Sequence, residues 1–181
     1  FDSNIYAKGA LVLNILRQLL GYDAFWRVVR NYAKEYQHKN VESQDLKRIF
    51  EDITGQNLEW FFDQWVYTAG LPELEIKYKY NRRNEHVKLT IKQTQNIQNS
   101  SLFRLPITVL IDNGEIIRQN IWIEDEESTF LIPSMRNPNM VLVDEGHIIP
   151  KRMNFDKKHT ELIYQAKNAP HILDRIWAIE K

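Results

Sequence analysis

The sequence predicts an α+β fold in which helices precede and follow a run of β-strands. Over residues 4–70 apolar side chains recur three and four positions apart, which is the spacing of a helix face that packs on a core. Between residues 74 and 143 apolar and polar residues alternate, as they do in half-buried strands. From about residue 156 the helical spacing returns. These observations indicate two helical regions separated by strands.

Four helices are expected before residue 71. The first covers residues 4–20 and is apolar enough to be a buried helix. Ser, Asp and Asn side chains accept hydrogen bonds from the free amides at a helix start, and glycine ends helices because it adopts left-handed backbone angles. The expected caps of the three later helices are Asp23, Ser43 and Asn57. The glycines expected to end helices are Gly21, Gly55 and Gly70.

The fourth of these helices is rich in aromatic residues. Trp60, Phe61, Phe62 and Trp65 resemble a stacking platform for a sugar or nucleotide at first sight. Their helical spacing is typical of a packed core instead. We therefore expect these side chains to be buried and to bind no ligand.

The alternating region predicts a β-sandwich, because several short half-buried strands separated by turns form two packed sheets. The expected strands are residues 74–80, 87–92, 105–111, 115–124, 129–132 and 140–143. Turns are expected at 81–84 and at the tight-turn sequence Asp112-Asn113-Gly114. The charged outward faces are expected to be solvated. Two helices follow, separated near Pro170.

Composition narrows the class of protein. The chain is 43% hydrophobic, so it has enough apolar residues for a core. Lys plus Arg and Asp plus Glu both number 24, and this balance argues against a general nucleic-acid surface. There is no cysteine, which excludes disulfides and thiolate chemistry. No apolar run is long enough to predict a membrane span. The lack of cysteine fits a cytoplasmic protein and leaves a periplasmic or secreted one open.

The first ten residues carry a pattern of their own. Phe1-Asp2, Tyr6 and Lys8-Gly9-Ala10 stand directly before or within the first apolar helix. This pattern resembles the zinc aminopeptidases of the aminopeptidase N and leukotriene A4 hydrolase family, the M1 metallopeptidases. Further residues match the same family in the same order: Leu20-Gly21, Asp45-Leu46, Thr54-Gly55, Gln64-Trp65, Gly70-Leu71-Pro72, Gln165 and Asp174-Arg175.

The resemblance covers essentially the whole chain but only about the middle third of such an enzyme. It implies that residues 1–71 are the helical C-terminal half of a thermolysin-like catalytic domain. Residues 72–153 would then be a β-sandwich domain, and residues 154–181 the first helices of a HEAT-like helical domain. On this interpretation the chain is a fragment, and its partners include upstream N-terminal and zinc-binding domains of the same protein.

The resemblance also implies a reaction, the removal of the N-terminal residue from peptide substrates. Tyr6 matches the tyrosine that donates a hydrogen bond to the oxyanion of the tetrahedral intermediate, and Phe1 matches an aromatic residue that contacts the substrate's N-terminal side chain. Zinc is expected in the full-length protein only. None of the five histidines stands in the His-Glu-x-x-His motif that binds zinc in this family. The fragment alone is therefore expected to bind no zinc and to be inactive.

Simpler interpretations stand beside these. Tyr6 could be a packing residue with a solvated hydroxyl, and Phe1 a frayed terminal residue. Lys8 is expected to cover apolar surface with its stem, and Gly9 to permit close helix packing. His147 falls in a predicted hairpin, as His86 does, and both are expected at the surface.

Two other functions remain open at this point. The parent protein could be a non-catalytic scaffold or interaction protein of the same fold that has lost its zinc ligands. The β-sandwich could instead be an independent binding module, although its strands show no exposed aromatic stripe and no flexible linker precedes it.

Overall fold

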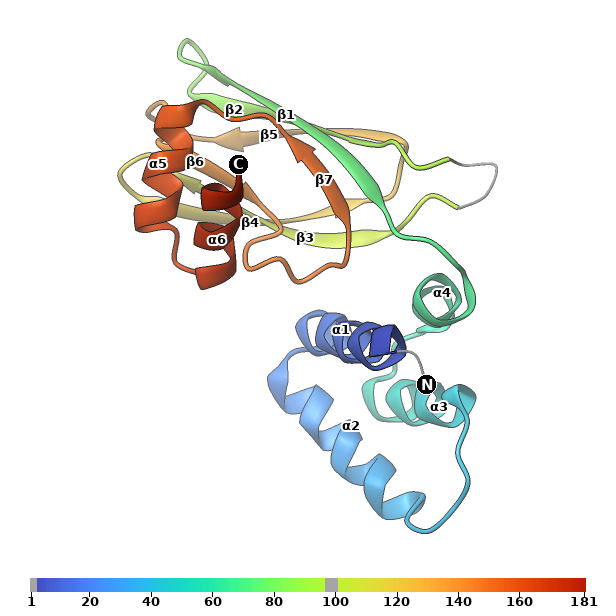
Figure 1. Cartoon of the computed structure of the whole chain (residues 1–181). Helices are drawn as coiled ribbons and strands as arrows, with labels where there is room; N and C mark the ends of the chain where they lie inside the picture. Colours follow the sequence, from blue (N-terminus) through green and yellow to red (C-terminus); the bar gives the residue numbers. More distant parts are fainter. Residues whose placement is uncertain (1–2, 97–100) are drawn as a thin grey trace. The chain divides into compact units, whose positions relative to one another are not determined.

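The computed structural model describes residues 3–96 and 101–181, with side chains described from Tyr6 onward. The chain divides into two compact units, Phe1–Ala69 and Gly70–Lys181, which we call unit 1 and unit 2. Unit 1 contains helices only, and unit 2 contains two sheets and two helices (Figure 1). The fold is therefore α+β, as predicted. Residues 154–181, which the resemblance assigns to a separate helical domain, lie in the same compact unit as the sheets.

Unit 1 consists of the expected four helical segments. They are α1 (Ser3–Leu20), α2 (Tyr22–Glu35), α3 (Ser43–Thr54) and α4 (Glu59–Phe62), and the last continues as a wider π-helical turn, η1 (Asp63–Tyr67). Gly55 ends α3 in the left-handed conformation with φ 68°, as predicted. The end predicted at Gly70 is wrong, because η1 already ends at Tyr67.

The predicted N-caps are each displaced by one or two residues. Gly21, not Asp23, caps α2, and Asp23 lies in its first turn. Glu42 rather than Ser43 caps α3, because the Asp45 carboxylate accepts a hydrogen bond from the Glu42 amide at 2.9 Å. This bond and a second from the Tyr36 hydroxyl lower the pKa of Asp45. Asn57 precedes the cap of α4, although its side chain does accept a hydrogen bond from the Glu59 amide.

The core of unit 1 is largely aromatic. Phe61, Phe62 and Trp65 are buried, which confirms that the aromatic cluster is core, whereas Trp60 is only half-buried. Phe25 of α2 packs against Phe50 of α3 with ring centroids 5.8 Å apart. The other buried apolar residues of this unit are Val12, Ile15, Leu16, Val28, Ile49 and Leu58. Helix α1 is buried on one face only.

Unit 2 has the predicted sandwich of two sheets, drawn as stacked layers in Figure 1. The strands are β1 (Glu73–Asn81), β2 (His86–Gln93), β3 (Leu105–Asp112), β4 (Ile116–Ile123), β5 (Glu127–Pro133), β6 (Met140–Val143) and β7 (Arg152–Phe155). One sheet has the order β5-β2-β1-β7 and the other β4-β3-β6. Strand β7 was not predicted. It pairs in parallel with β1, from Glu73 opposite Arg152 to Ile76 opposite Phe155.

Two helices, α5 (His159–Asn168) and α6 (Ile172–Glu180), cover part of the smaller sheet (Figure 1). Ala169, which follows α5, forms one buried cluster with Leu110 of β3 and Met140 and Leu142 of β6. Tyr164 packs against that cluster. Strand β3 is consequently buried on both faces near its end, because the other sheet covers one face and this helix pair the other.

A buried glutamine at the end of β2 forms hydrogen bonds with the neighbouring segments of the chain. Gln93 donates hydrogen bonds from its side-chain amide to the carbonyls of Phe103, at 2.8 Å, and Asp125, at 3.2 Å. Its side-chain oxygen accepts the Phe103 amide and the Gln95 side chain, both at 2.9 Å. All four hydrogen-bonding positions of this buried side chain are therefore used.

Replacing Gln93 with leucine should lower the free energy of unfolding by about 1–3 kcal/mol, because buried backbone groups lose their partners. Urea unfolding followed by circular dichroism measures this change. Gln44→Leu on the exposed surface of α3 serves as the control, and it should shift stability by less than about 0.5 kcal/mol. Equal effects of the two substitutions would contradict this account of Gln93.

Candidate functional site

Tyr6 lies in the second turn of α1, and its side chain is 71% exposed. The hydroxyl is therefore not enclosed by the packed interior of unit 1. Leu13 follows seven residues later, so the two side chains share one face of the helix. Tyr6 thus stands near the N-terminal end of a face that continues along α1.

That face of α1 borders an open apolar groove of about 390 Å³. Gly9, Leu13 and Leu16 line it from α1, and Leu46 and Trp65 line it from α3 and η1. Val12 and Leu16, which also line the groove, are buried, and so is Ile15 on the side of the helix away from Tyr6. The helix that carries Tyr6 is therefore anchored by packing two turns further along the chain.

The other residues of the opening pattern have different surroundings. Phe1 and Asp2 lie outside the described residues. Lys8 is half-buried and lines the apolar groove, as expected of a lysine whose stem covers apolar surface. The prediction that Gly9 permits close packing is wrong, because a Cβ added at Gly9 would meet no atom within 4 Å.

The described residues do not fit a zinc site. Among residues 3–96 and 101–181, no group of three or more His, Asp or Glu side chains could hold a metal ion. Tetrahedral zinc needs three or four such ligands around one point.

A second cavity, of about 580 Å³, lies in unit 2 between β1 and the start of α5. Three of its lining residues, Tyr78, Glu161 and Tyr164, form hydrogen bonds within the protein. Tyr78 donates a hydrogen bond to Glu161 at 2.7 Å, and Tyr164 donates one to Asp112 at 3.0 Å. Burial, followed by the contact with Glu161, raises the pKa of Tyr78. These three side chains at the cavity therefore have partners from the protein itself.

A group of buried polar residues at the start of the C-terminal helices was not predicted, because the prediction followed only the spacing of apolar residues. Lys157, Glu161 and Gln165 follow one another at intervals of four, and all three side chains are buried. Two polar residues four apart on α5, preceded by a lysine at the same interval, are a signal that the sequence does contain. His147 was expected at the surface, and this is wrong, because only 23% of its side chain is exposed and it lies 3.4 Å from Asp174.

Comparison with known proteins supports the family that the resemblance implies. Residues 1–65 match the model of the peptidase family M1 domain. The chain is 25% identical over 153 residues to puromycin-sensitive aminopeptidase of Caenorhabditis elegans, covering 81% of this chain and 16% of that protein. It is 26% identical over 128 residues to tricorn protease-interacting factor F2 of Thermoplasma volcanium, covering 70% of this chain and 16% of that protein.

Structural comparison agrees on the fold. Aminopeptidase A of Legionella pneumophila, solved in complex with aspartic acid, matches 98% of this chain and 21% of its own with a TM-score of 0.84 at 20% identity. Helices, sandwich and helix pair thus follow the architecture of a known peptidase. The chain matches the peptidase family M1 domain over residues 1–65, as the resemblance predicted, and a named aminopeptidase over 81% of its length. It spans about a sixth of the length of the two curated relatives described above.

No helix in the described part of the chain is both long and apolar enough to cross a membrane.

Gly9 and Gly55 allow a direct test of helix α1. Neither has an atom within 4 Å of an added Cβ, but Gly55 has a left-handed φ of 68° and Gly9 lies within the helix. Gly9→Ala should raise the free energy of unfolding by about 0.5–1 kcal/mol, because alanine loses less backbone entropy in a helix. Gly55→Ala should lower it, because alanine is strained at that φ.

Urea unfolding of both variants measures the contrast. A destabilised Gly9→Ala protein would show that the groove beside α1 is filled where the structure leaves it open.

Proposed function

We propose that this chain is part of a zinc-dependent aminopeptidase that removes the N-terminal residue from peptides, and that Tyr6 stabilises the oxyanion of the tetrahedral intermediate. The observation that carries the proposal is the exposed phenol of Tyr6, within the residues that match the M1 domain and on a helix anchored by its buried face. The segments 1–71, 72–153 and 154–181 would be the catalytic, sandwich and helical parts of that enzyme.

A phenol suits this role because its hydroxyl is a neutral donor at neutral pH. When water attacks the scissile carbonyl, the carbonyl oxygen gains negative charge. A hydrogen bond to that oxygen is stronger in the transition state than in the bound peptide, so it increases turnover rather than affinity. Removing one such donor typically costs roughly 2.7–4 kcal/mol of barrier.

The placement of Tyr6 on α1 supports this role. A donor accelerates the reaction only if it is held in position before the charge develops. Val12 and Ile15, about 1.7 and 2.5 turns beyond Tyr6, are buried, so the helix axis is fixed by core packing while the phenol stays accessible.

Zinc belongs to the proposal only for the full-length protein. The described residues supply no ligand set, so we infer that the ligands come from sequence outside this chain. We expect the 181-residue chain by itself to be inactive, and the peptide substrate to meet Tyr6 only when the zinc-binding residues are present. Phe1 is proposed to contact the substrate's N-terminal side chain.

In the full-length enzyme, Tyr6→Phe should lower kcat by about 100- to 1,000-fold, because one oxyanion donor is lost. KM and zinc content should change little, since the hydroxyl is not proposed to bind the ground state or the metal. Hydrolysis of an aminoacyl p-nitroanilide measures kcat and KM, and elemental analysis measures zinc.

Tyr22→Phe is the matched control, because Tyr22 is also a helical tyrosine of unit 1 and is 66% exposed. It should leave kcat unchanged. An unchanged kcat in Tyr6→Phe would refute the oxyanion role. A wild-type protein without zinc or turnover would instead favour the alternative, a non-catalytic scaffold of the same fold.

A further inference from the structure

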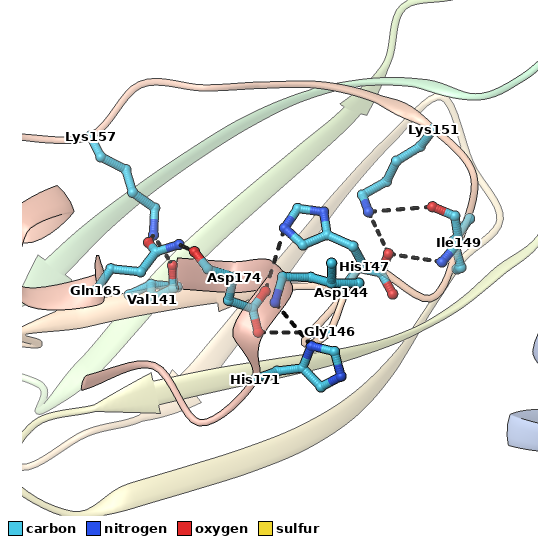
Figure 2. A network of polar contacts seen from close by, with 11 residues as sticks. Val141, Asp144, Gly146, His147, Ile149, Lys151, Lys157, Gln165, His171 and Asp174 are labelled. Carbon is cyan, nitrogen blue, oxygen red and sulfur yellow. Dashed lines mark hydrogen bonds and ion pairs between the residues drawn. The ribbon is translucent and has the colours of Figure 1, made fainter. Parts of the chain in front are cut away.

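A cluster of buried charges joins the loop between β6 and β7 to the two C-terminal helices (Figure 2). Asp144 in the loop and Asp174 on α6 are both buried carboxylates. Lys151 in the loop and Lys157 ahead of α5 are both buried cations, with side chains 3% and 1% exposed. Buried charges are stable only when each is paired and hydrogen-bonded. We call this set, together with His147 and His171, the loop–helix cluster.

The loop 144–151 has an unusual backbone that the carboxylates stabilise. Asp144 and His147 have φ of 62° and 52°, a region that residues with side chains adopt at a cost. Asp144 accepts the amide of Ile149, and Asp174 accepts the amide of Gly146, both at 3.0 Å. The second bond crosses from α6 to the loop. The loop conformation therefore depends on a carboxylate that the next helix supplies.

The cluster continues from α6 to strand β6. Gln165 donates a hydrogen bond to the backbone carbonyl of Asp174 at 2.8 Å, and its side-chain oxygen accepts one from Lys157 at 2.6 Å. Lys157 also donates to the carbonyl of Val141 in β6 and pairs with Glu161 at 3.1 Å. Loop, strand and both helices are thus connected through a few side chains.

His147 is the imidazole of the cluster that contacts a buried carboxylate, and imidazole is the side chain type that changes charge between pH 5 and 8. Its Nε2 lies 3.4 Å from Asp174 Oδ1, and its ring packs near Trp177, with centroids 6.2 Å apart. The charged and titratable groups that face it are Asp144 and Lys151 from its own loop, Lys157 ahead of α5, and His171 and Asp174 from the start of α6. A proton on His147 would add a third cation to a cluster in which Lys151 is already paired with Asp144.

We propose that the loop–helix cluster is an acid-sensitive latch, in which protonation of His147 releases the loop 144–151 from helix α6. In the closed state the imidazole is neutral and half-buried. Once protonated it gains more from hydration than from its long contact with Asp174, so the loop opens and the Asp174–Gly146 hydrogen bond is lost. The latch is independent of the aminopeptidase proposal, because it lies wholly in unit 2.

The direction of the pH dependence follows from the groups around His147. Burial, and then Lys151, lower the pKa of His147 below its ordinary value of 6.5, and only Asp144 acts in the opposite direction. The open loop therefore binds the proton more tightly than the closed loop. Closure is fully favoured above pH 6.5 and weakens as the pH falls toward the lowered pKa.

Asp174 contributes with the opposite sign. Burial raises its pKa above 3.8, so the closed state holds a proton on this carboxyl more tightly than the open state does. As the pH falls from that raised pKa toward 3.8, Asp174 favours closure. A variant that removes only His147 is needed to separate the two contributions.

Hydrogen exchange of the 181-residue chain at pH 7.5, 6.5 and 5.5, corrected for intrinsic rates, tests the latch. Protection of the Gly146 and Ile149 amides should fall with acid by up to about tenfold per pH unit, because opening takes up one proton. In His147→Gln this slope should vanish. His86→Gln, in β2 and outside the cluster, should keep it.

Two outcomes would overturn the proposal. One is an equal pH slope in wild type and His147→Gln. The other is protection that rises with acid in wild type, which would mean that protonated His147 and Asp174 bind each other more tightly. If His147→Gln does not fold, an NMR titration of the unmodified chain decides: a His147 pKa below 6.5 supports the latch, and a value at or above 6.5 overturns it.

Discussion

A helix can hold a side chain in a fixed place in solvent only if its opposite face is packed, and α1 meets this constraint. Val12, Ile15 and Leu16 are buried, whereas Tyr6 is 71% exposed and Leu13 lines an open groove. The buried residues set the position of the helix, and the exposed side carries the Tyr6 side chain. The function proposed for Tyr6 depends on this division, because a hydroxyl on an unanchored helix would not be ready for a developing charge.

Unit 2 meets a different constraint, since its helix pair is attached to the sandwich through buried polar groups as well as apolar ones. Ala169 and Tyr164 supply apolar contacts with the smaller sheet. Glu161 accepts hydrogen bonds from Tyr78 and from the amide of Val141, in addition to its ion pair with Lys157. Such contacts stabilise only one arrangement of helix and sheet, because any shift would leave a buried charge without its partner.

The sequence allowed the elements to be predicted wherever local spacing decides the structure. The helical period of unit 1, the alternation of β1 and β2 and the left-handed end at Gly55 depend on residues close in the chain. Strand β7 was missed because it forms only by pairing with β1, far earlier in the chain. His147 was misjudged for the same reason, since the residue that covers it, Asp174, belongs to a later helix. The caps were displaced because which oxygen reaches a free amide depends on backbone angles that the sequence does not show.

The role of Tyr6 cannot be predicted from the spacing of apolar residues alone. Tyr6 and Tyr22 are both exposed tyrosines on helices with a buried face, and periodicity treats them alike. The pattern of burial shows which side of a helix packs into the core. The chemistry of an exposed hydroxyl depends instead on the atom to which it donates a hydrogen bond. What separates Tyr6 from Tyr22 is the pattern around it, Lys8-Gly9-Ala10 within the residues that match the M1 domain. The fold explains how Tyr6 can be held still, and the motif supplies the reason to expect a peptide carbonyl in front of it.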